Sequence, residues 1–218
     1  MTQPGSDPTS IIDRFRLDGR VAVVTGSGRG IGRGIALGLA SAGADVVVTA
    51  RRPEEVESVT EEVRQLGRRA VGVLADITEE ATIPMLVDRA MNDLGRLDVW
   101  VSNAGGSEHK GTYDTLDMPD EHWDAQFDLN LRPHFRAAKA CAAVMEAGSS
   151  LIGISSTSSL GPSLRFAAYG AAKAGMNQLT TTLALELAPR GIRANAIAVG
   201  IVPTESLRTI GGIQDEAL

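Results

Sequence analysis

The fold of this chain is decided by one stretch near its N-terminus, Val21-Ala-Val-Val-Thr25-Gly26-Ser27-Gly28-Arg29-Gly30-Ile31-Gly32. The residues up to Thr25 are mostly β-branched and predict a short buried strand. Apolar residues then recur at helical spacing, at positions 31, 35 and 39, until Gly43. A glycine cluster alone is more often a plain turn. Between a strand and a helix it is typical of a dinucleotide site, because glycine lets a pyrophosphate approach the backbone and the helix N-terminus offers free N–H groups.

The rest of the chain continues to alternate strand and helix. Further strands are expected at 45–49, 70–74, 97–102, 151–154 and 193–198, and further helices at 53–66, 79–94, 119–147 and 169–188. Such an order with short connections predicts a single Rossmann-type, doubly wound parallel sheet in a three-layer α/β/α arrangement. We expect a polar N-terminal leader at 1–17, an NAD(P)-binding catalytic domain at 18–204 and a further segment at 205–218.

Composition narrows the class of protein. The 218 residues are 43% hydrophobic and 22% charged, which is ordinary for a globular protein. The net charge is −6 and basic residues are not clustered, so nucleic acid is not an expected partner. A single cysteine, Cys141, excludes intrachain disulfides and fits a reducing compartment. We see no signal peptide and no apolar run that could span a membrane, and we expect a cytoplasmic protein.

The end of the second strand indicates which cofactor binds. NAD sites usually place an acidic residue there, to hold the ribose 2′-hydroxyl. Here the strand continues into Ala50-Arg51-Arg52, and no carboxylate follows before Glu54. An arginine pairs with a 2′-phosphate, and Arg29 in the glycine loop is a second candidate for it. Arg51 and Arg52 would otherwise be solvated surface charges. We predict NADP(H), with NAD(H) as the runner-up.

Two further strand ends carry candidate cofactor residues. Asp76 follows the third strand and would accept a hydrogen bond from the adenine amino group, or cap the next helix, with Thr78 sharing these roles. The fourth strand ends in Ser102-Asn103-Ala104-Gly105-Gly106. Small residues at a strand end fit a cofactor that lies flat across it, and they equally fit a tight turn.

The reactive groups are expected after the fifth strand. Tyr169 and Lys173 are four residues apart in a helical run, so both side chains leave the same face. A nearby ammonium favours the phenolate, so we predict that Lys173 lowers the pKa of Tyr169 toward neutrality. Ser156 lies at the carboxyl end of the strand, where open α/β sheets bind ligands. Asn130 is a polar residue on a helix face that otherwise looks apolar, with Trp123 and Phe127; buried asparagines are more often structural than catalytic.

These residues together resemble the short-chain dehydrogenase/reductase family. The motifs are Thr25-Gly26-x-x-x-Gly30-x-Gly32, Ser102-Asn103-Ala104-Gly105, Asn130, Ser156 and Tyr169-x-x-x-Lys173, in an order and spacing that match over residues 20–204. The resemblance implies that Tyr169 is the general acid or base and that Ser156 binds the substrate oxygen. It also implies that Lys173 binds the nicotinamide ribose and that Asn130 holds a water linking Lys173 to solvent.

The cofactor site implied by the glycine loop and the resemblance is larger than the reactive set. Its expected residues are Gly26, Ser27, Arg29, Gly30, Ile31, Gly32, Arg51, Arg52, Asp76, Ile77, Asn103, Ala104, Gly105, Tyr169, Lys173, Gly200, Val202 and Thr204. No metal site is expected, because His109, His122 and His134 lack ligand-like spacing with acids or the cysteine. We expect these histidines in loops or on the surface.

The chain departs from the family pattern at three points. Ser102 replaces an asparagine, and Val199 replaces a proline before Gly200. The sequence also ends soon after Thr204, where family members continue through a substrate lid, a helix and a strand. Either this sequence is a fragment of a longer chain, or the family's last strand and helix are absent from the fold. In the second case we expect an exposed sixth-strand edge, and in both cases residues 205–218 are expected to be the start of the lid.

The predicted function is an oxidoreductase that transfers hydride between NADP(H) and a ketone or secondary alcohol. The expected partner is a small, partly apolar carbonyl compound or alcohol, and the expected assembly is a homo-tetramer or dimer through the helices at 119–147 and 169–188. The alternative is a catalytically silent nucleotide-binding or interaction protein. The complete set of Asn130, Ser156, Tyr169 and Lys173 argues against that alternative.

Overall fold

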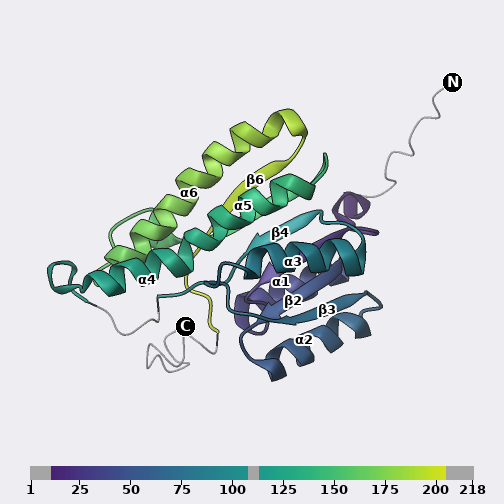
Figure 1. Ribbon diagram of the computed structural model, residues 1–218, viewed down its shortest axis with the longest axis horizontal. Coiled ribbons are helices and arrows are strands. Elements are labelled where there is room, and N and C mark those ends of the chain that lie inside the picture. The colour runs from purple at the N-terminus through teal and green to yellow at the C-terminus, as the bar shows by residue number, and fades with distance from the viewer. Residues whose placement is uncertain (1–10, 108–112, 205–218) are drawn as a thin grey trace.

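One parallel sheet organises the molecule, with the strand order β3-β2-β1-β4-β5-β6 (Figure 1). The computed structural model describes residues 11–107 and 113–204. The strands are β1 (Val21–Thr25), β2 (Asp45–Ala50), β3 (Ala70–Leu74), β4 (Val99–Ser102), β5 (Ser150–Ser156) and β6 (Arg193–Val199). The order reverses between β1 and β4, which are direct neighbours. The predicted doubly wound α/β fold is confirmed.

Helices cover both faces of this sheet. The α-helices are α1 (Gly30–Ser41), α2 (Pro53–Gln65), α3 (Thr82–Arg89), α4 (Asp120–Asn130), α5 (Arg132–Val144) and α6 (Ala167–Leu187). Shorter helical segments are η1 (Ile11–Phe15), η2 (Ala90–Leu94), η3 (Thr115–Asp117), η4 (Thr157–Ser159) and η5 (Ala188–Arg190). All helices in the described part of the chain are too short or too polar to cross a lipid bilayer.

The alternation of side chains along the strands produces two apolar cores. Val21, Val23 and Trp100 face α3, α5 and the end of α6. Val24 and Val48 face the other side and pack against α1 and α2. Because successive strand residues point to opposite faces, the same short Val-rich runs supply both cores. This pattern makes β1 and β2 buried on both sides and fixes the register in which their carboxyl ends line up.

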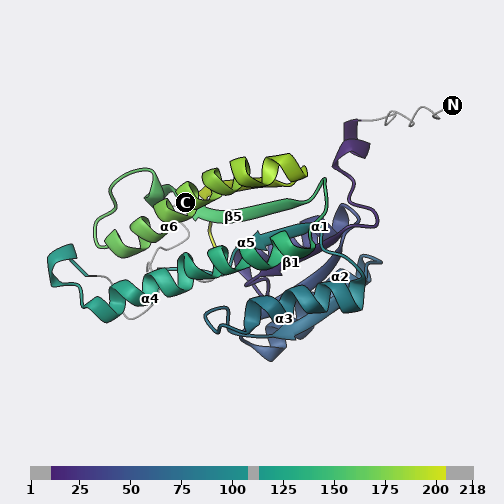
Figure 2. The ribbon, with the colours of Figure 1, turned by 45° about the horizontal axis from the view of Figure 1, so that its top comes forward.

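The predicted helix at 119–147 is two helices. α4 ends at Asn130 and α5 starts at Arg132, with Leu131 between them at φ −120° and ψ −51°. Pro133 explains the break, since proline has no N–H for the carbonyl four residues earlier and its ring crowds that carbonyl. Figures 1 and 2 show α4 and α5 running one after the other alongside α6.

The face of α4 that packs inward differs from the expected one. Trp123 and Phe127 stack with ring centroids 4.9 Å apart, and Trp123 is 40% exposed. The buried residues of α4 are His122, Gln126 and Asn130. Asn130 lies seven residues after Trp123, which keeps the two on one side of the helix, but the buried residues beside it are His122 and Gln126. The expectation of an otherwise apolar face was therefore wrong.

The amino end of the sheet is held by a buried carboxylate. Asp98 is 4% exposed and accepts hydrogen bonds from Arg20 Nη1 (2.6 Å), Arg96 Nε (2.7 Å) and the Val21 N–H (2.9 Å). Burial alone would raise its pKa, but these hydrogen bonds outweigh burial and leave the pKa of Asp98 below its usual value. This cluster ties the start of β1 to the start of β4.

The two ends of the chain agree with the predicted boundaries only in part. Residues 11–15 of the predicted leader form η1, and the Leu17 N–H donates to the Ala42 carbonyl at 2.7 Å, so the last part of the leader packs on the domain. β6 lies at one edge of the described sheet, and Ile197 on it is 51% exposed. Residues 1–10 and the predicted lid segment, 205–218, lie outside the described residues.

Candidate active site

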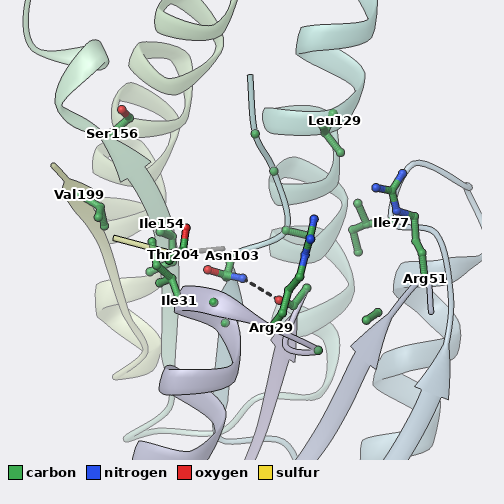
Figure 3. A pocket seen from close by; sticks show the side chains of 18 of the residues that line it. Arg29, Ile31, Arg51, Ile77, Asn103, Leu129, Ile154, Ser156, Val199 and Thr204 are labelled. Atoms are coloured by element: carbon green, nitrogen blue, oxygen red, sulfur yellow. Dashed lines mark hydrogen bonds between the residues drawn. The ribbon is translucent and has the colours of Figure 1, made fainter. Parts of the chain in front are cut away.

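A groove of about 360 Å³ crosses the carboxyl ends of the strands at the point where the strand order reverses. This is the place where open α/β sheets bind ligands. Figure 3 shows Arg29 and Arg51 toward one end of the groove and Ser156 toward the other, with Asn103 and Thr204 between them. The glycine loop, the ends of β2 to β5 and the start of α6 all contribute to its walls.

The glycine loop is shaped by close backbone contacts. A Cβ on Gly32 would lie 2.1 Å from the Gly26 carbonyl oxygen and 2.5 Å from Asn103 Nδ2. Asn103 Nδ2 in turn donates to the carbonyls of Thr25 (2.8 Å) and Gly26 (3.2 Å) (Figure 3). The α1 N-terminus that follows has no side-chain cap. Gly30, Ile31 and Gly32 of this first turn line the groove, where uncapped N–H groups suit a pyrophosphate.

Three arginines and two carboxylates meet at the far end of the groove. Arg52 is paired with Glu55 at 2.8 Å, Arg29 lies 3.8 Å from the same carboxylate, and Arg51 Nη1 lies 3.9 Å from Asp76. The sequence analysis missed Glu55, whose carboxylate lies 2.9 Å from where a Cβ on Gly28 would be. Its place in the first turn of α2 was the available signal, since that turn follows β2 directly.

Asp76 is held by the turn after β3. Its Oδ1 accepts from the Thr78 N–H (2.9 Å) and the Thr78 hydroxyl (2.7 Å). The alternative that Asp76 caps the next helix was wrong, because α3 begins at Thr82 and its N-cap residue is Ala81. Asp76 and Ile77 line the groove, and the adenine contact stays a prediction.

Ser156, Tyr169 and Lys173 come together at the other end. Ser156 is the last residue of β5, and Tyr169 and Lys173 lie one turn apart near the start of α6. Lys173 is 3% exposed, and its Nζ donates to the Ile154 carbonyl at 2.7 Å. Burial lowers the pKa of Lys173 to about 8.

The predicted direction of the tyrosine pKa was wrong for this structure. Burial raises the pKa of Tyr169 above its ordinary value, while a hydrogen bond with Ser156 lowers it by less. The Lys173 ammonium lies 5.8 Å from the centroid of the tyrosine ring and is directed to the Ile154 carbonyl. Four-residue spacing therefore places the two side chains on one face without making the cation a direct partner of the phenol.

Asn130 does not line the groove. Its Oδ1 accepts from the Gly106 N–H (3.0 Å), and its Nδ2 donates to the Gly106 carbonyl (3.1 Å) and to Gln126 Oε1 (3.1 Å). The side chain thus clamps the loop after β4 from both sides. Gly105 lies beside it, since a Cβ there would be 2.7 Å from Asn130 Oδ1 and 3.3 Å from Lys173 Nζ.

A buried histidine of α5, His134, joins β4 to α6. His134 is 1% exposed; its Nδ1 lies 3.0 Å from Ser102 Oγ and its Nε2 lies 3.0 Å from Thr180 Oγ1. Ser102 Oγ accepts from Trp100 Nε1, and Thr180 Oγ1 donates to the Met176 carbonyl. These fixed directions assign the proton of the neutral ring to Nε2. Burial, and to a smaller extent the nearby Lys173 charge, lower the pKa of His134 to about 4.

Two corrections follow from this network. His122 and His134 are buried in helices, contrary to the expected loop or surface positions, and His109 lies outside the described residues. Ser102, which departs from the family pattern, hydrogen-bonds both Trp100 and His134 through its hydroxyl group.

Most predicted cofactor residues line the groove, and two do not. Ser27 is fully buried and its Oγ accepts from the Thr49 N–H at 2.9 Å, so it supports the loop from behind. Val202 is 40% exposed and is not part of the groove wall. The groove is also lined by residues that were not predicted to bind cofactor: Gly28, Ala50, Glu55, Ala75, Gly106, Leu129, Ile154, Ser155, Ser156 and Val199.

Comparison with known proteins gives a consistent result. A family model described as short chain dehydrogenase matches residues 20–212. The 7alpha-hydroxysteroid dehydrogenase of Escherichia coli (strain K12) is 34% identical over 200 residues, which are 91% of this chain and 77% of that enzyme.

Solved structures agree. One, of a 7alpha-hydroxysteroid dehydrogenase complexed with NADH and 7-oxo glycochenodeoxycholic acid, superposes with a TM-score of 0.87 at 34% identity, over 94% of this chain and 78% of that one. Another, of a short chain dehydrogenase from Burkholderia cenocepacia J2315 in complex with NADP, gives a TM-score of 0.82 at 34% identity, over 87% of this chain and 77% of that one. The two structures hold different nicotinamide cofactors.

Proposed function

Since this chain belongs to the short-chain dehydrogenase family, a class of NAD(P)-dependent oxidoreductases, we propose that it reduces a ketone to a secondary alcohol with NADPH. The observation that carries the proposal is the meeting of Ser156, Tyr169 and Lys173 at one end of a groove whose other end is rich in arginine. A nicotinamide cofactor supplies the hydride when it is bound, and the residues of the chain supply orientation and the proton.

The proton comes from Tyr169. The phenol is protonated at neutral pH and can donate to a carbonyl oxygen, and burial, which raises its pKa, makes it a weaker acid than a free phenol. Ser156 hydrogen-bonds the same tyrosine, and its proposed role is to hold the substrate oxygen beside it. Lys173, with a pKa of about 8, is mostly charged at neutral pH and favours the phenolate that remains after proton transfer.

The charge at the far end of the groove supports NADP(H). Three guanidinium groups, those of Arg29, Arg51 and Arg52, line it with two carboxylates, Glu55 and Asp76, which leaves one excess positive charge. A 2′-phosphate would replace the long contact between Arg51 and Asp76 with a charge-assisted pair. Glu55 is the feature that favours NAD(H), because a carboxylate so close to the glycine loop can accept from a ribose hydroxyl.

Tyr169→Phe tests the reaction. We expect it to lower kcat for ketone reduction by about 10²–10⁴-fold, because the proton donor is removed. Binding of NADPH, followed by its fluorescence, should stay close to that of the wild type. An unchanged kcat would contradict the assignment and would favour a protein that binds nucleotide without this chemistry.

Titration with NADPH and with NADH tests the cofactor. We expect NADPH to bind at least about tenfold more tightly, and Arg51→Ala to remove most of that difference. Arg64→Ala, which removes an exposed arginine elsewhere on α2, is the matched control and should change neither affinity. Equal binding of both cofactors, or an NADH preference, would contradict the role of the arginines.

We also propose that copies of the chain associate through α4, α5 and α6. Trp123 and Phe135 are large apolar side chains that are 40% and 48% exposed on α4 and α5, and Leu185 on α6 is 76% exposed. Exposed aromatic residues on long helices are typical of protein interfaces. Light scattering of the wild type should give a mass above that of the monomer, and Trp123→Glu should reduce it; a monomeric wild type would contradict the proposal.

A further inference from the structure

The turn after β5, which begins at Ser156, is fixed by two neighbouring serines. Ser156 caps η4, and its Oγ accepts a hydrogen bond from the Ser158 N–H at 3.2 Å. The Ser156 carbonyl accepts a second hydrogen bond, from the Ser159 hydroxyl at 2.5 Å. Ser156 is therefore held at its side chain and at its backbone, and Ser159, which holds the backbone, does not line the groove.

Asn177 of α6 connects this turn to the helix. Its Nδ2 donates to Ser159 Oγ at 2.7 Å. The orientation of the amide follows from the partners: the Ser156 carbonyl can only accept, so the single proton of the Ser159 hydroxyl lies toward it. The atom of Asn177 that meets the same hydroxyl must then be a donor. The hydrogen bonds run in one direction, from Asn177 through Ser159 to Ser156, and each strengthens the next.

This chain of hydrogen bonds joins the two elements that carry the candidate reactive residues. Ser156 belongs to β5, whereas Tyr169 and Lys173 belong to α6. Asn177 follows Lys173 by four residues and therefore lies on the same face of the helix. A Cβ on Gly170 would lie 2.9 Å from a carbonyl oxygen of η4, so the helix and the turn approach closely at this point.

Asn177 is not the residue that stability alone would favour. Its Oδ1 is buried and has no hydrogen-bond partner among the described residues. A buried acceptor without a partner is costly, and a leucine of similar size would fill the space without that cost. An amide that uses its nitrogen and leaves its oxygen unpaired points to a role for the nitrogen beyond packing.

On the basis of the proposed function, we propose that Asn177 and Ser159 are positioning residues that hold Ser156 where it and Tyr169 reach the same substrate oxygen. Neither Asn177 nor Ser159 lines the groove, so both act through the backbone of Ser156. Without the contact to α6, the turn is free to move relative to the helix, and Ser156 loses its hydrogen bond to Tyr169. A displacement of about 1 Å is enough to cost about a hundredfold in rate.

Substitutions of Asn177 and Ser159 test the proposal, with butanedione as the ketone and NADPH as the reductant. We expect Asn177→Leu and Ser159→Ala each to lower kcat about tenfold, because Ser156 is no longer held in place. The Kd of NADPH and the Tm should stay close to those of the wild type. Ser159→Thr keeps the hydroxyl and should retain kcat, as should Gln178→Leu, the matched control at an exposed position of α6. Wild-type kcat in both Asn177→Leu and Ser159→Ala would overturn the proposal.

The same change in a Ser156→Ala background separates positioning of Ser156 from general support of the site. If Asn177 acts through Ser156, Asn177→Leu should have almost no further effect on kcat once Ser156 is an alanine. A second loss of about tenfold in that background would overturn the proposal. Wild-type kcat in Ser156→Ala itself would contradict the proposed function, and the positioning role with it. A slow Ser156→Ala enzyme beside a fully active Asn177→Leu enzyme would overturn positioning alone.

Crystal structures test the geometry without any activity. We expect Ser156 Oγ and Tyr169 Oη to lie within about 3.2 Å of each other in the wild type. In Asn177→Leu and Ser159→Ala the separation should increase by about 0.5–1 Å. An equal separation in all three proteins would overturn the proposal. An increased separation beside a wild type that does not reduce butanedione would contradict the proposed function, while it would support the geometric role of Asn177.

Discussion

Each end of the sheet has a buried charged side chain, Asp98 at the amino ends of the strands and Lys173 at the carboxyl ends, and the two differ in their hydrogen-bond partners. At the amino ends of the strands, Asp98 is held by two arginines and a backbone N–H. At the carboxyl ends, the Lys173 ammonium has three donors and makes one hydrogen bond within the described chain, to the Ile154 carbonyl. Asp98 has its pKa lowered, which means that its charged form is favoured by the fold. Lys173 has its pKa lowered too, which for a lysine means that its charged form is disfavoured.

We propose that Asp98 serves the fold and that Lys173 serves the function. A buried carboxylate with a full set of donors stabilises the fold, because the partners offset the loss of water. A buried ammonium with spare donors is costly to keep, and such a cost is typical of groups that act on a ligand. The following predictions test this contrast by removing one member at a time.

Replacement of Lys173 by methionine should have the largest effect, and on activity. The charge that favours the Tyr169 phenolate is lost, so we expect kcat to fall by about a hundredfold or more. The free energy of unfolding should change by less than about 1 kcal/mol or rise, because an apolar side chain of similar length suits a buried site. Lys139→Met, at an exposed position of α5, is the control. A folded Lys173→Met enzyme with full activity would contradict a functional role for the Lys173 charge.

Asp98→Asn should show the opposite pattern. We expect the free energy of unfolding to fall by about 3 kcal/mol, because Arg20 and Arg96 lose the charge they are paired with. Urea denaturation measures it, with Asp128→Asn, an exposed carboxylate paired with Arg132, as the control. Activity of the folded fraction should be retained, since Asp98 is at the end of the sheet away from the groove. A loss of turnover without a loss of stability would contradict the assignment.

Substitution of two glycines of α1, Gly32 and Gly34, tests how tightly the glycine loop is packed at the carboxyl ends of the strands. Gly32→Ala places a Cβ against the Gly26 carbonyl and Asn103, and we expect a loss of about 1–3 kcal/mol together with weaker NADPH binding. Gly34→Ala, two residues on in the same helix, meets nothing within 4 Å and should stabilise by about 0.5–1 kcal/mol. Calorimetry and cofactor titration compare the two. Equal effects of both changes would show that the loop is not tightly packed.

The pH dependence of stability tests the same two buried charges. For Asp98, whose folded pKa is lowered, the contribution to stability is present above the unfolded value and is lost as pH falls below about 4. For Lys173, whose folded pKa is about 8 against 10.5 unfolded, stability is gained as pH rises through that range. The difference in Tm between the wild type and Lys173→Met should therefore shift in favour of the wild type between pH 8 and pH 10.5. If this Tm difference did not change with pH, the Lys173 ammonium would be exposed to solvent in the folded protein, contrary to the structure.

Local patterns along the chain predicted the elements well. The strand, glycine loop and helix at 21–41 and the positions of β2 and β3 follow from side-chain periodicity, which is a property of neighbouring residues. The single long helix predicted at 119–147 was wrong because the prediction did not take into account that Pro133 interrupts a helix. The arginines at the end of β2 and the Tyr169–Lys173 pair were also visible from spacing alone.

What the sequence by itself determined is therefore the order of the elements, the doubly wound sheet and the choice of candidate reactive residues. Tertiary structure alone decided their partners. It directed the Lys173 ammonium to the Ile154 carbonyl, raised the pKa of Tyr169 through burial, brought Glu55 back to the glycine loop and turned a polar face of α4 inward. The reason is physical: spacing fixes which side of a helix a residue occupies, whereas desolvation and hydrogen bonding depend on segments distant in the chain, which only the packed fold brings together.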